Sequence, residues 1–202
     1  MTSHPLDMSD APIDAHGSID KLMPQLHLPV QSGSNKILKA MNRRHTYEKY
    51  LEIIDKLRQT RADMCFSSDI IVGYPGETEK DFQDTIAIIK EVKFAQVYSF
   101  KYSPRPGTPA AELPQLPEEI KTERLRQLQA LTRVHQDEFN AMSLDKNLDV
   151  LITNKGKRPG QVTGFSQYLQ SVVIDDGAKH IGNIVRVKII KILSNTLKGE
   201  VI

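Results

Sequence analysis

The chain has 202 residues, of which 39% are hydrophobic and 26% are charged. This composition is typical of a globular protein with one or two cored domains. It excludes a membrane-spanning helix, because no apolar run approaches the length of about 18 residues that such a helix needs. The single cysteine, Cys65, excludes an internal disulfide and, by itself, a multi-cysteine metal site. Since the first residues carry no secretory leader, we expect a protein of the reducing cytoplasm with no membrane partner.

The charge is unevenly divided along the chain. Residues 1–142 hold 18 basic and 20 acidic side chains, whereas residues 143–202 hold 9 basic and 5 acidic ones. A basic tail behind a near-neutral body favours a polyanion as the partner of the tail. The excess is small and also fits an ordinary solvated surface, so both interpretations stay open.

Three short apolar segments in the first half of the chain are typical of buried strands, at residues 25–31, 64–72 and 95–102. Helices are predicted between them, beginning after the capping residues Ser34, Thr46 and Thr78. Strands that alternate with helices in this way pair in parallel through helical crossovers. The first part of the chain is therefore predicted to have an α/β fold.

The pattern changes in the last third of the chain. A connector helix is predicted from residue 117 to about residue 142, with leucines along one side. Five short strand candidates follow, at residues 148–153, 160–164, 169–174, 184–193 and 196–202. Five strands so close together fit a small closed or partly closed barrel. We therefore divide the chain into an α/β domain, residues 1–142, and an all-β domain, residues 143–202.

The α/β domain is too small for a complete barrel. Three parallel strands, with room for one more near residue 1, make only part of a TIM-type barrel, which takes about 250 residues. An unpaired parallel edge at the start would be exposed and prone to aggregate. We therefore expect residues 1–110 to form the later portion of a larger barrel domain.

Four motifs occur in a fixed order along the chain: His-Leu-Pro-Val-Gln-Ser-Gly-Ser at 27–34, Met-Asn-Arg-Arg at 41–44, Asp-Ile-Ile-Val-Gly-Tyr-Pro-Gly-Glu-Thr at 69–78, and Phe-Lys-Tyr-Ser-Pro-Arg-Pro-Gly-Thr-Pro at 100–109. They resemble the radical S-adenosylmethionine tRNA methylthiotransferases, and residues 2–7 look like an earlier barrel strand of that family. The five-strand tail resembles the TRAM domain, an RNA-binding barrel. The motifs are closest to the branch that modifies isopentenyladenosine beside the anticodon. Related branches act on threonylcarbamoyladenosine or on a ribosomal-protein aspartate.

The sequence departs from this family in its cysteines. The family carries three cysteines in an N-terminal domain and a Cys-x3-Cys-x2-Cys loop, each for one iron–sulfur cluster, and this chain has neither. A [4Fe–4S] cluster needs three or four thiolates, and Cys65 lies in an apolar strand, where we expect a small buried hydrophobe. The resemblance thus implies S-adenosylmethionine as cofactor and [4Fe–4S] clusters whose ligands are absent here. We expect the chain to be inactive without a missing N-terminal part, the alternative being a cluster-free RNA-binding or scaffold protein.

The resemblance also implies a set of residues that bind S-adenosylmethionine at the carboxyl ends of the strands. Gln31 and Asp69 suit its hydroxyls or amine, and Arg43 offers a planar fork for its carboxylate. A helix-end cation and a strand-end cap are the plain alternatives for Arg43 and Asp69. The full expected set is Gln31, Ser32, Arg43, Asp69, Ile71 and Gly73, with the last two beside the adenine. No catalytic side chain and no metal ligand is expected in this chain.

Basic residues of the tail are the candidates for contact with tRNA. Lys155, Lys157 and Arg158 cluster on a predicted hairpin loop, and Arg186 and Lys188 share one face of a strand. Such side chains contact phosphates and supply affinity, although a solvated surface is the alternative. In the α/β domain, Arg105 lies on a stiff proline-rich loop, where it either meets a phosphate or substrate or merely belongs to a rigid exit from the last strand. After Gly164 the family has Arg-Thr, and this chain has Phe165 and Ser166 instead, which weakens the RNA prediction at that position.

Overall fold

The computed structural model describes residues 3–202, which divide by their contacts into two compact units. One unit holds the residues up to 22 together with 26–136, and the other holds 23–25 together with 137–202. The division falls within the long helix α5, Glu118–Ala141. In the part of the chain that the structure describes, none of the helices is long and apolar enough to cross a membrane.

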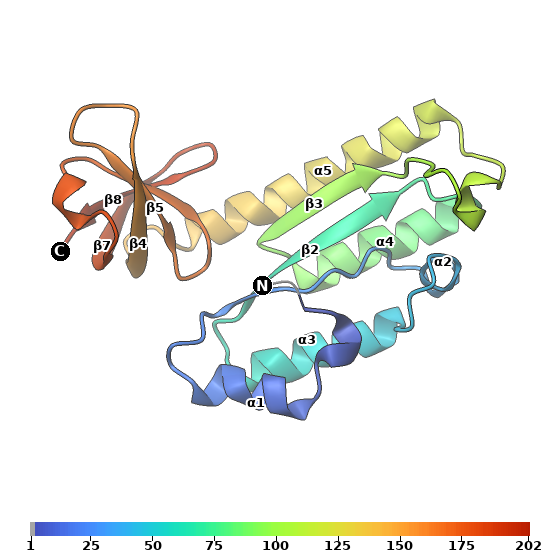
Figure 1. Ribbon diagram of the computed structural model, residues 1–202, viewed down its shortest axis with the longest axis horizontal. Helices are drawn as coiled ribbons and strands as arrows, with labels where there is room; N and C mark the ends of the chain where they lie inside the picture. Colours follow the sequence, from blue (N-terminus) through green and yellow to red (C-terminus); the bar gives the residue numbers. More distant parts are fainter. Residues whose placement is uncertain (1–2) are drawn as a thin grey trace. The chain divides into compact units, whose positions relative to one another are not determined.

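The first unit is built on a three-stranded sheet with the order β1-β2-β3 (Figure 1). The strands are β1 Gln25–His27, β2 Cys65–Val72 and β3 Gln96–Lys101. Strands β2 and β3 pair in parallel from Ser67↔Gln96 to Val72↔Lys101. The connections are helical: α2 Asn35–Ala40 and α3 Tyr47–Thr60 join β1 to β2, and α4 Glu79–Val92 joins β2 to β3. The predicted parallel α/β arrangement is confirmed.

The helix starts follow from the capping residues that the sequence offers. Ser34, Thr46 and Thr78 are the N-caps of α2, α3 and α4, and the side chain of each accepts a backbone N–H of the first turn. These bonds satisfy donors that an uncapped helix would leave unpaired. Thr78 and Asp81 form a reciprocal capping box.

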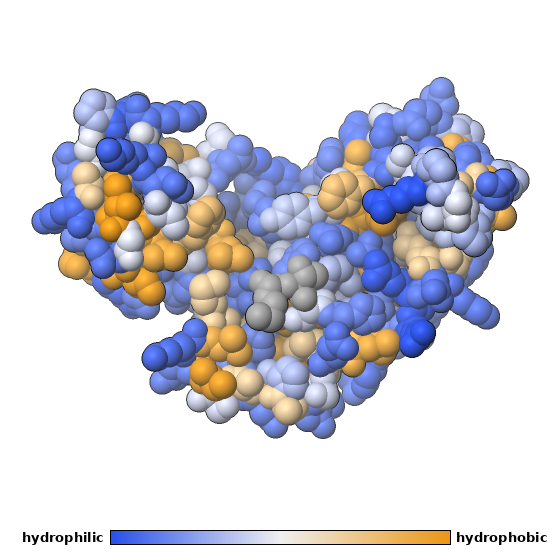
Figure 2. Space-filling view, viewed as in Figure 1, coloured by the Kyte–Doolittle hydropathy of each residue, from blue (hydrophilic) through white to orange (hydrophobic). Residues whose placement is uncertain are grey.

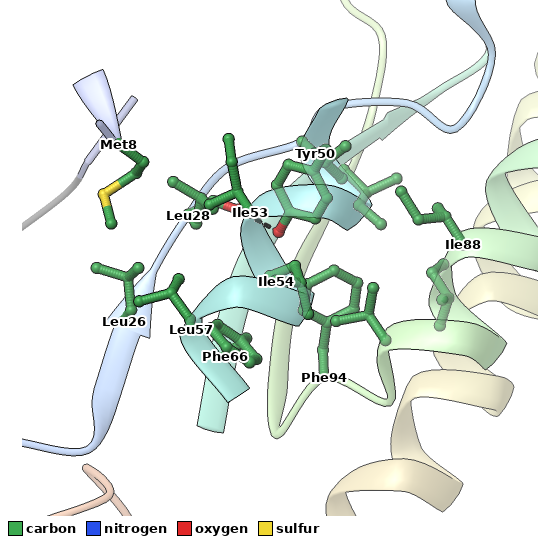
Figure 3. Packing of buried hydrophobic residues seen from close by; sticks show 14 of the residues in the cluster. Met8, Leu26, Leu28, Tyr50, Ile53, Ile54, Leu57, Phe66, Ile88 and Phe94 are labelled. Atoms are coloured by element: carbon green, nitrogen blue, oxygen red, sulfur yellow. Dashed lines mark hydrogen bonds between the residues drawn. The ribbon is translucent and has the colours of Figure 1, made fainter. Parts of the chain in front are cut away.

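The two faces of β2 differ in what covers them. Phe66, Ile70 and Val72 are at most 2% exposed and pack into the main core with side chains of α3 and α4 (Figure 3). Asp69 and Ile71 point to the other face and are half-buried. On β3, Tyr98 and Phe100 are 46% and 53% exposed. The sheet is therefore closed on its helical face and open on the face that carries Asp69.

Cys65 is buried, as predicted for a small hydrophobe, at 5% exposure. Burial raises the pKa of its thiol to about 12, so the thiolate is not available at neutral pH. Among the described residues, no group of three or more His, Cys, Asp or Glu side chains is placed to hold a metal ion. The described residues therefore do not fit an iron–sulfur cluster.

One helix near the start of the chain was not predicted. Helix α1, Asp10–Ser18, was missed, because Pro12, Gly17 and a single buried apolar residue, Ile13, give it no clear helical period. The further strand expected near residue 1 falls partly on residues 1 and 2, which lie outside the described residues. From Ser3 on, the chain makes one backbone bond to His27 and then a short 3-10 helix, Pro5–Asp7.

The second unit is a closed five-stranded barrel with the order β4-β5-β6-β8-β7. The strands are β4 Asn147–Lys155, β5 Val162–Ser166, β6 Ser171–Ile174, β7 Ile184–Ile192 and β8 Leu197–Val201, which confirms the five predicted segments. Their inward side chains, mostly Val, Ile and Leu, fill one core. At Gly164 an added Cβ would lie 2.1 Å from the carbonyl oxygen of Leu151, so β5 approaches β4 too closely for any other residue.

The buried hydrogen bond of Tyr50 should contribute measurably to the stability of the first unit. The Tyr50 ring is fully buried and its hydroxyl donates to the carbonyl oxygen of Leu28 at 2.8 Å. Tyr50→Phe removes the donor and leaves that carbonyl unpaired, so we expect a loss of about 1–3 kcal/mol in the free energy of unfolding by urea denaturation. Tyr47→Phe, on the exposed side of the same helix, is the control and should change it little. Equal effects of the two substitutions would contradict this role.

Candidate functional site

The carboxyl ends of β1 and β2 meet at one edge of the sheet. Gln31, just past β1, accepts from the backbone N–H of Ile71 at 3.0 Å, and its own N–H donates to the carbonyl of Asp69 at 2.9 Å. Its φ of +71° is a left-handed conformation that costs free energy for a residue with a side chain. The structure thus places the backbones of Gln31, Asp69 and Ile71 side by side, with the Gln31 side chain buried.

Asp69 belongs to the open face of the sheet, and its position differs from the prediction. It lies within β2 rather than at the strand end, because the strand continues to Val72. Its carboxylate is 31% exposed and lies 3.5 Å from Nε2 of His27, whose Nδ1 is 2.9 Å from the Ser67 hydroxyl. The neighbouring residue on β3 is Tyr98, which also contacts the His27 ring edge-on. Asp69 is therefore an accessible acceptor between a histidine and an exposed aromatic ring.

His27, Tyr98 and Phe100 also lie on the open face and were not among the predicted site residues. A histidine on a short apolar strand is expected to be a packing residue, but His27 is only half-buried and its ring contacts Tyr98 edge-on. The two aromatic residues stand beside Asp69 and Ile71 on the neighbouring strand. The signal that would have found them is the period of two along β3, which puts Tyr98 and Phe100 on one face.

Gly73 follows β2 in a conformation that glycine alone tolerates well. Its φ is +75°, and an added Cβ would lie 2.3 Å from Cγ of Lys121. Its N–H donates to the Glu77 carboxylate at 2.7 Å, and Arg124 of α5 donates to the same oxygen at 2.7 Å. Burial raises the pKa of Glu77, against the lowering by the Gly73 N–H and by Arg124. A buried ion pair thus fixes the turn after β2.

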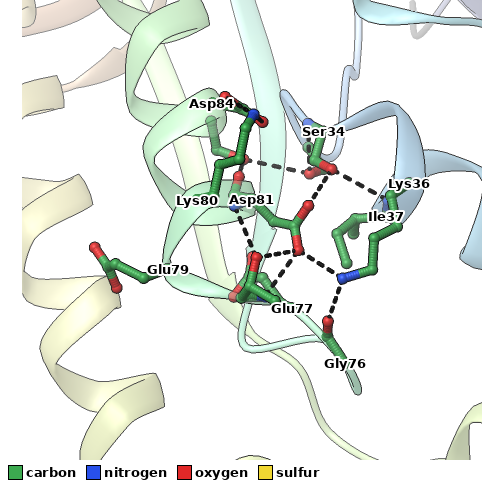
Figure 4. A network of polar contacts seen from close by, with 12 residues as sticks. Ser34, Lys36, Ile37, Gly76, Glu77, Glu79, Lys80, Asp81 and Asp84 are labelled. Atoms are coloured by element: carbon green, nitrogen blue, oxygen red, sulfur yellow. Dashed lines mark hydrogen bonds and ion pairs between the residues drawn. The ribbon is translucent and has the colours of Figure 1, made fainter.

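Asp81 joins the loops that follow β1 and β2 (Figure 4). The Ser34 hydroxyl donates to its Oδ1 at 2.7 Å, and Lys36 donates to its Oδ2 at 2.8 Å and to the carbonyl of Gly76 at 2.8 Å. Burial alone would raise the pKa of Asp81, but the hydrogen bonds from Lys36, Thr78 and Ser34 together lower it well below its ordinary value. The two loops that frame the site are therefore held by one charged side chain.

The remaining predicted cofactor residues lie elsewhere. Ser32 is fully buried, and its hydroxyl is 3.3 Å from that of Thr85 and accepts the backbone N–H of Ser34. Arg43 is half-buried and lines a hollow of about 390 Å³ with His4, Asp7, Asn42 and Arg44. The residues that line this hollow do not include Gln31 or Asp69. The expected set thus divides into Asp69 and Ile71 on the open face, Gln31, Ser32 and Gly73 buried past the strand ends, and Arg43 at the hollow.

The predicted RNA-binding residues also fall into groups. Lys155, Lys157 and Arg158 line a groove of about 790 Å³ on the barrel, together with Lys191 and Lys198. Lys198 was missed, because it reaches the groove from β8, far along the chain. Arg186 and Lys188 lie on the outer face of β7 and do not line the groove, and Arg186 donates to Asp149 at 2.8 Å. In the first unit, Arg105 is exposed on the loop after β3.

The Asp81 network predicts a characteristic acid response. Asp81→Asn removes a buried carboxylate that accepts several hydrogen bonds, and should lower the free energy of unfolding at neutral pH by about 2–3 kcal/mol. Because the folded-state pKa lies below the unfolded value of about 3.9, this stabilisation is complete above that pH and is lost as the pH falls below it. Denaturation curves of the two proteins should therefore converge in acid.

Asp84→Asn is the control for Asp81→Asn, since Asp84 pairs with Lys80 on the surface of the same helix. It should change stability by less than about 1 kcal/mol. A gap between the wild-type protein and Asp81→Asn that is constant across the acid range would contradict the assignment.

Comparisons with known proteins agree with this architecture. The Radical SAM superfamily model matches residues 12–89, and the TRAM domain model matches residues 146–202. Among solved structures, the chain is similar to coproporphyrinogen III oxidase from Escherichia coli, described as a radical SAM enzyme. That match has a TM-score of 0.54 and 13% identity, and covers 97% of this chain and 49% of that one. At this identity the similarity concerns the fold alone.

Curated relatives match at much higher identity. The tRNA-2-methylthio-N(6)-dimethylallyladenosine synthase of Erythrobacter litoralis (strain HTCC2594) is 52% identical over 100% of this chain. The synthases of the same name from Wolbachia pipientis wMel and from Wolbachia pipientis subsp. Culex pipiens (strain wPip) are 55% identical over 98% of it. The alignments cover 45%, 46% and 46% of these relatives, so the chain spans about half their length. The chain is thus similar to the radical SAM and TRAM domain models over two separate ranges, and over nearly its whole length to part of three synthases that share one name.

Proposed function

We propose that this chain provides the S-adenosylmethionine-binding sheet face and the tRNA-binding barrel of an enzyme that methylthiolates isopentenyladenosine next to the anticodon. The identity of 52–55% to synthases named for this modified nucleoside supports that branch over the threonylcarbamoyladenosine and ribosomal-protein branches. The observation that carries the proposal is the exposed Asp69 carboxylate on the open face, next to the strand end at which the buried Gln31 pairs with β2. A tRNA-modifying enzyme works where tRNA is, so we also propose a cytoplasmic location.

The residues of the open face suit a nucleoside that carries an amino acid. Asp69 is an exposed carboxylate that accepts from ribose hydroxyls or an ammonium group, and the Gln31 amide both donates and accepts. The half-buried Ile71, beside the exposed Phe100 of β3, offers an apolar surface that suits the flat adenine ring, whereas the space at Gly73 is filled by the Lys121 side chain. Arg43 takes the carboxylate only if the bound molecule reaches the separate hollow, and otherwise it remains a helix-end cation.

The iron–sulfur clusters of such an enzyme do not fit the described residues, since Cys65 is buried and protonated. We propose that the cluster ligands lie outside these 202 residues, in the N-terminal part of the whole enzyme. S-adenosylmethionine supplies the radical that starts this type of reaction when it is bound at a cluster. The role of the present residues is to hold the cofactor, orient it and bind the tRNA.

Cofactor binding by the open face is measurable on this chain. Asp69→Ala removes a charged acceptor, so the Kd for S-adenosylmethionine from isothermal titration should rise about tenfold. Asp84→Asn, on the surface of α4, should leave the Kd unchanged. An unchanged Kd in Asp69→Ala would argue against this site.

Binding of tRNA by the barrel has a salt signature. The double variant Lys155→Ala/Lys157→Ala should weaken tRNA binding and reduce the slope of log K against log salt by about two, one for each phosphate that the variant no longer neutralises. The control, Lys146→Ala/Lys179→Ala, removes the same charge from exposed barrel positions outside the groove. Equal changes in slope for both pairs would show a general charge effect rather than a groove. Filter binding across a salt series measures the slope.

A further inference from the structure

The groove on the barrel combines positive charge on long side chains with little opposing charge. Its lining includes five cations, Lys155, Lys157, Arg158, Lys191 and Lys198. Lys198 is paired with Asp175 at 2.8 Å. The charge of Arg158 also helps to lower the pKa of the Asp175 carboxyl, after the larger effect of the hydrogen bonds from Lys198 and Gln161. Among the ion pairs of the described residues, none holds Lys155, Lys157 or Lys191. These three ammonium groups are therefore available to a polyanionic backbone that runs along the groove.

An exposed aromatic ring lies at the rim of the same groove. Phe165 is 46% exposed on the outer face of β5, between the inward residues Gly164 and Ser166. Its partner across to β6 is Ser171, and Thr163 precedes it on the same face. Both of these neighbours line the groove. The ring thus adjoins the groove at its rim, next to Thr163 and Ser171.

The cations and the aromatic ring together indicate which class of ligand the groove suits. A cationic groove that holds phosphates, with an aromatic ring on which a base stacks, is the usual arrangement for binding unpaired strands. Paired bases are already stacked in a duplex and cannot lie on a side chain, so the ring favours loops and splayed nucleotides. We propose that the groove binds an unpaired RNA segment with one base stacked on Phe165. This inference rests on the proposed binding of tRNA by the barrel and names the part of the RNA involved.

A protein partner is the competing occupant of this surface. Phe165 begins a row of exposed apolar side chains that crosses three strands, with Leu151 at 43% and Ile184 at 70% exposure. Figure 2 shows apolar surface on the barrel among hydrophilic side chains. The two ends of the row differ in their surroundings. Phe165 adjoins the cationic groove, which suits a polyanion, whereas Ile184 lies two strands away and outside the groove. Ile184 therefore serves as the matched control.

The test uses the 202-residue chain and two fluorescent probes, a short unstructured RNA and a blunt RNA duplex of equal length. Anisotropy titrations compare the wild-type protein with Phe165→Leu, Phe165→Tyr and Ile184→Ala. Phe165→Leu should weaken single-strand binding about tenfold with an unchanged salt slope, since stacking and not charge is removed. Phe165→Tyr and Ile184→Ala should bind like the wild-type protein, and the duplex should bind more weakly than the single strand. Thermal unfolding checks that every variant is folded.

A second readout detects the stack itself. A fluorescent adenine analogue in the single strand should be quenched on binding to the wild-type protein and to Phe165→Tyr, and much less on Phe165→Leu at saturation. Wild-type affinity in Phe165→Leu, or equal affinity for the duplex, would overturn the inference while leaving RNA binding by the barrel intact. A loss of affinity in Ile184→Ala equal to that in Phe165→Leu would also overturn it. If neither probe nor tRNA binds, the proposed function fails as well.

Discussion

The carboxylate of Asp81 is the interaction on which the candidate site most depends. It gathers the Ser34 hydroxyl, the Lys36 ammonium group and the Thr78 cap around one buried charge. A buried anion is stable only when it is fully hydrogen-bonded. That requirement ties the loop after β1, through Ser34 and Lys36, to the start of α4 after β2. The Glu77–Arg124 pair does the same for the far end of the second loop.

The two faces of β2 have different roles in the first unit: one packs against the helices, and the other carries accessible side chains. Residues that alternate toward the helices are buried to near completion, so they leave no freedom for ligand contacts. Those that alternate the other way, Asp69 and Ile71, are half-buried next to Tyr98 and Phe100. A parallel sheet is usually covered on both faces. The open face of β2 and β3 is an exception to this rule, and it is the face to which the proposed cofactor site belongs.

In the barrel, the side chains that form the core point inward and the accessible side chains point outward. Closure removes the free edges that an isolated sheet would expose. The inward residues are then confined to one small apolar core, and function is left to the outer face and to the β4–β5 loop. Cations from the loop and from β7 and β8 reach the groove only because the strands close on one another. Phe165 adds an aromatic surface at its rim.

The sequence alone determined the elements, since local signals specify them. Periodicity located the eight strands of the described residues, and the caps at Ser34, Thr46 and Thr78 located the helices, because a cap bonds to its own first turn and needs no distant partner. It could not show helix α1, whose single buried apolar residue forms no pattern. Nor could it show that Arg43 lines a hollow with His4 and Asp7 or that Lys198 joins Lys155. Only the tertiary structure decided those groupings, because proximity between residues distant in the chain depends on how strands pair and close.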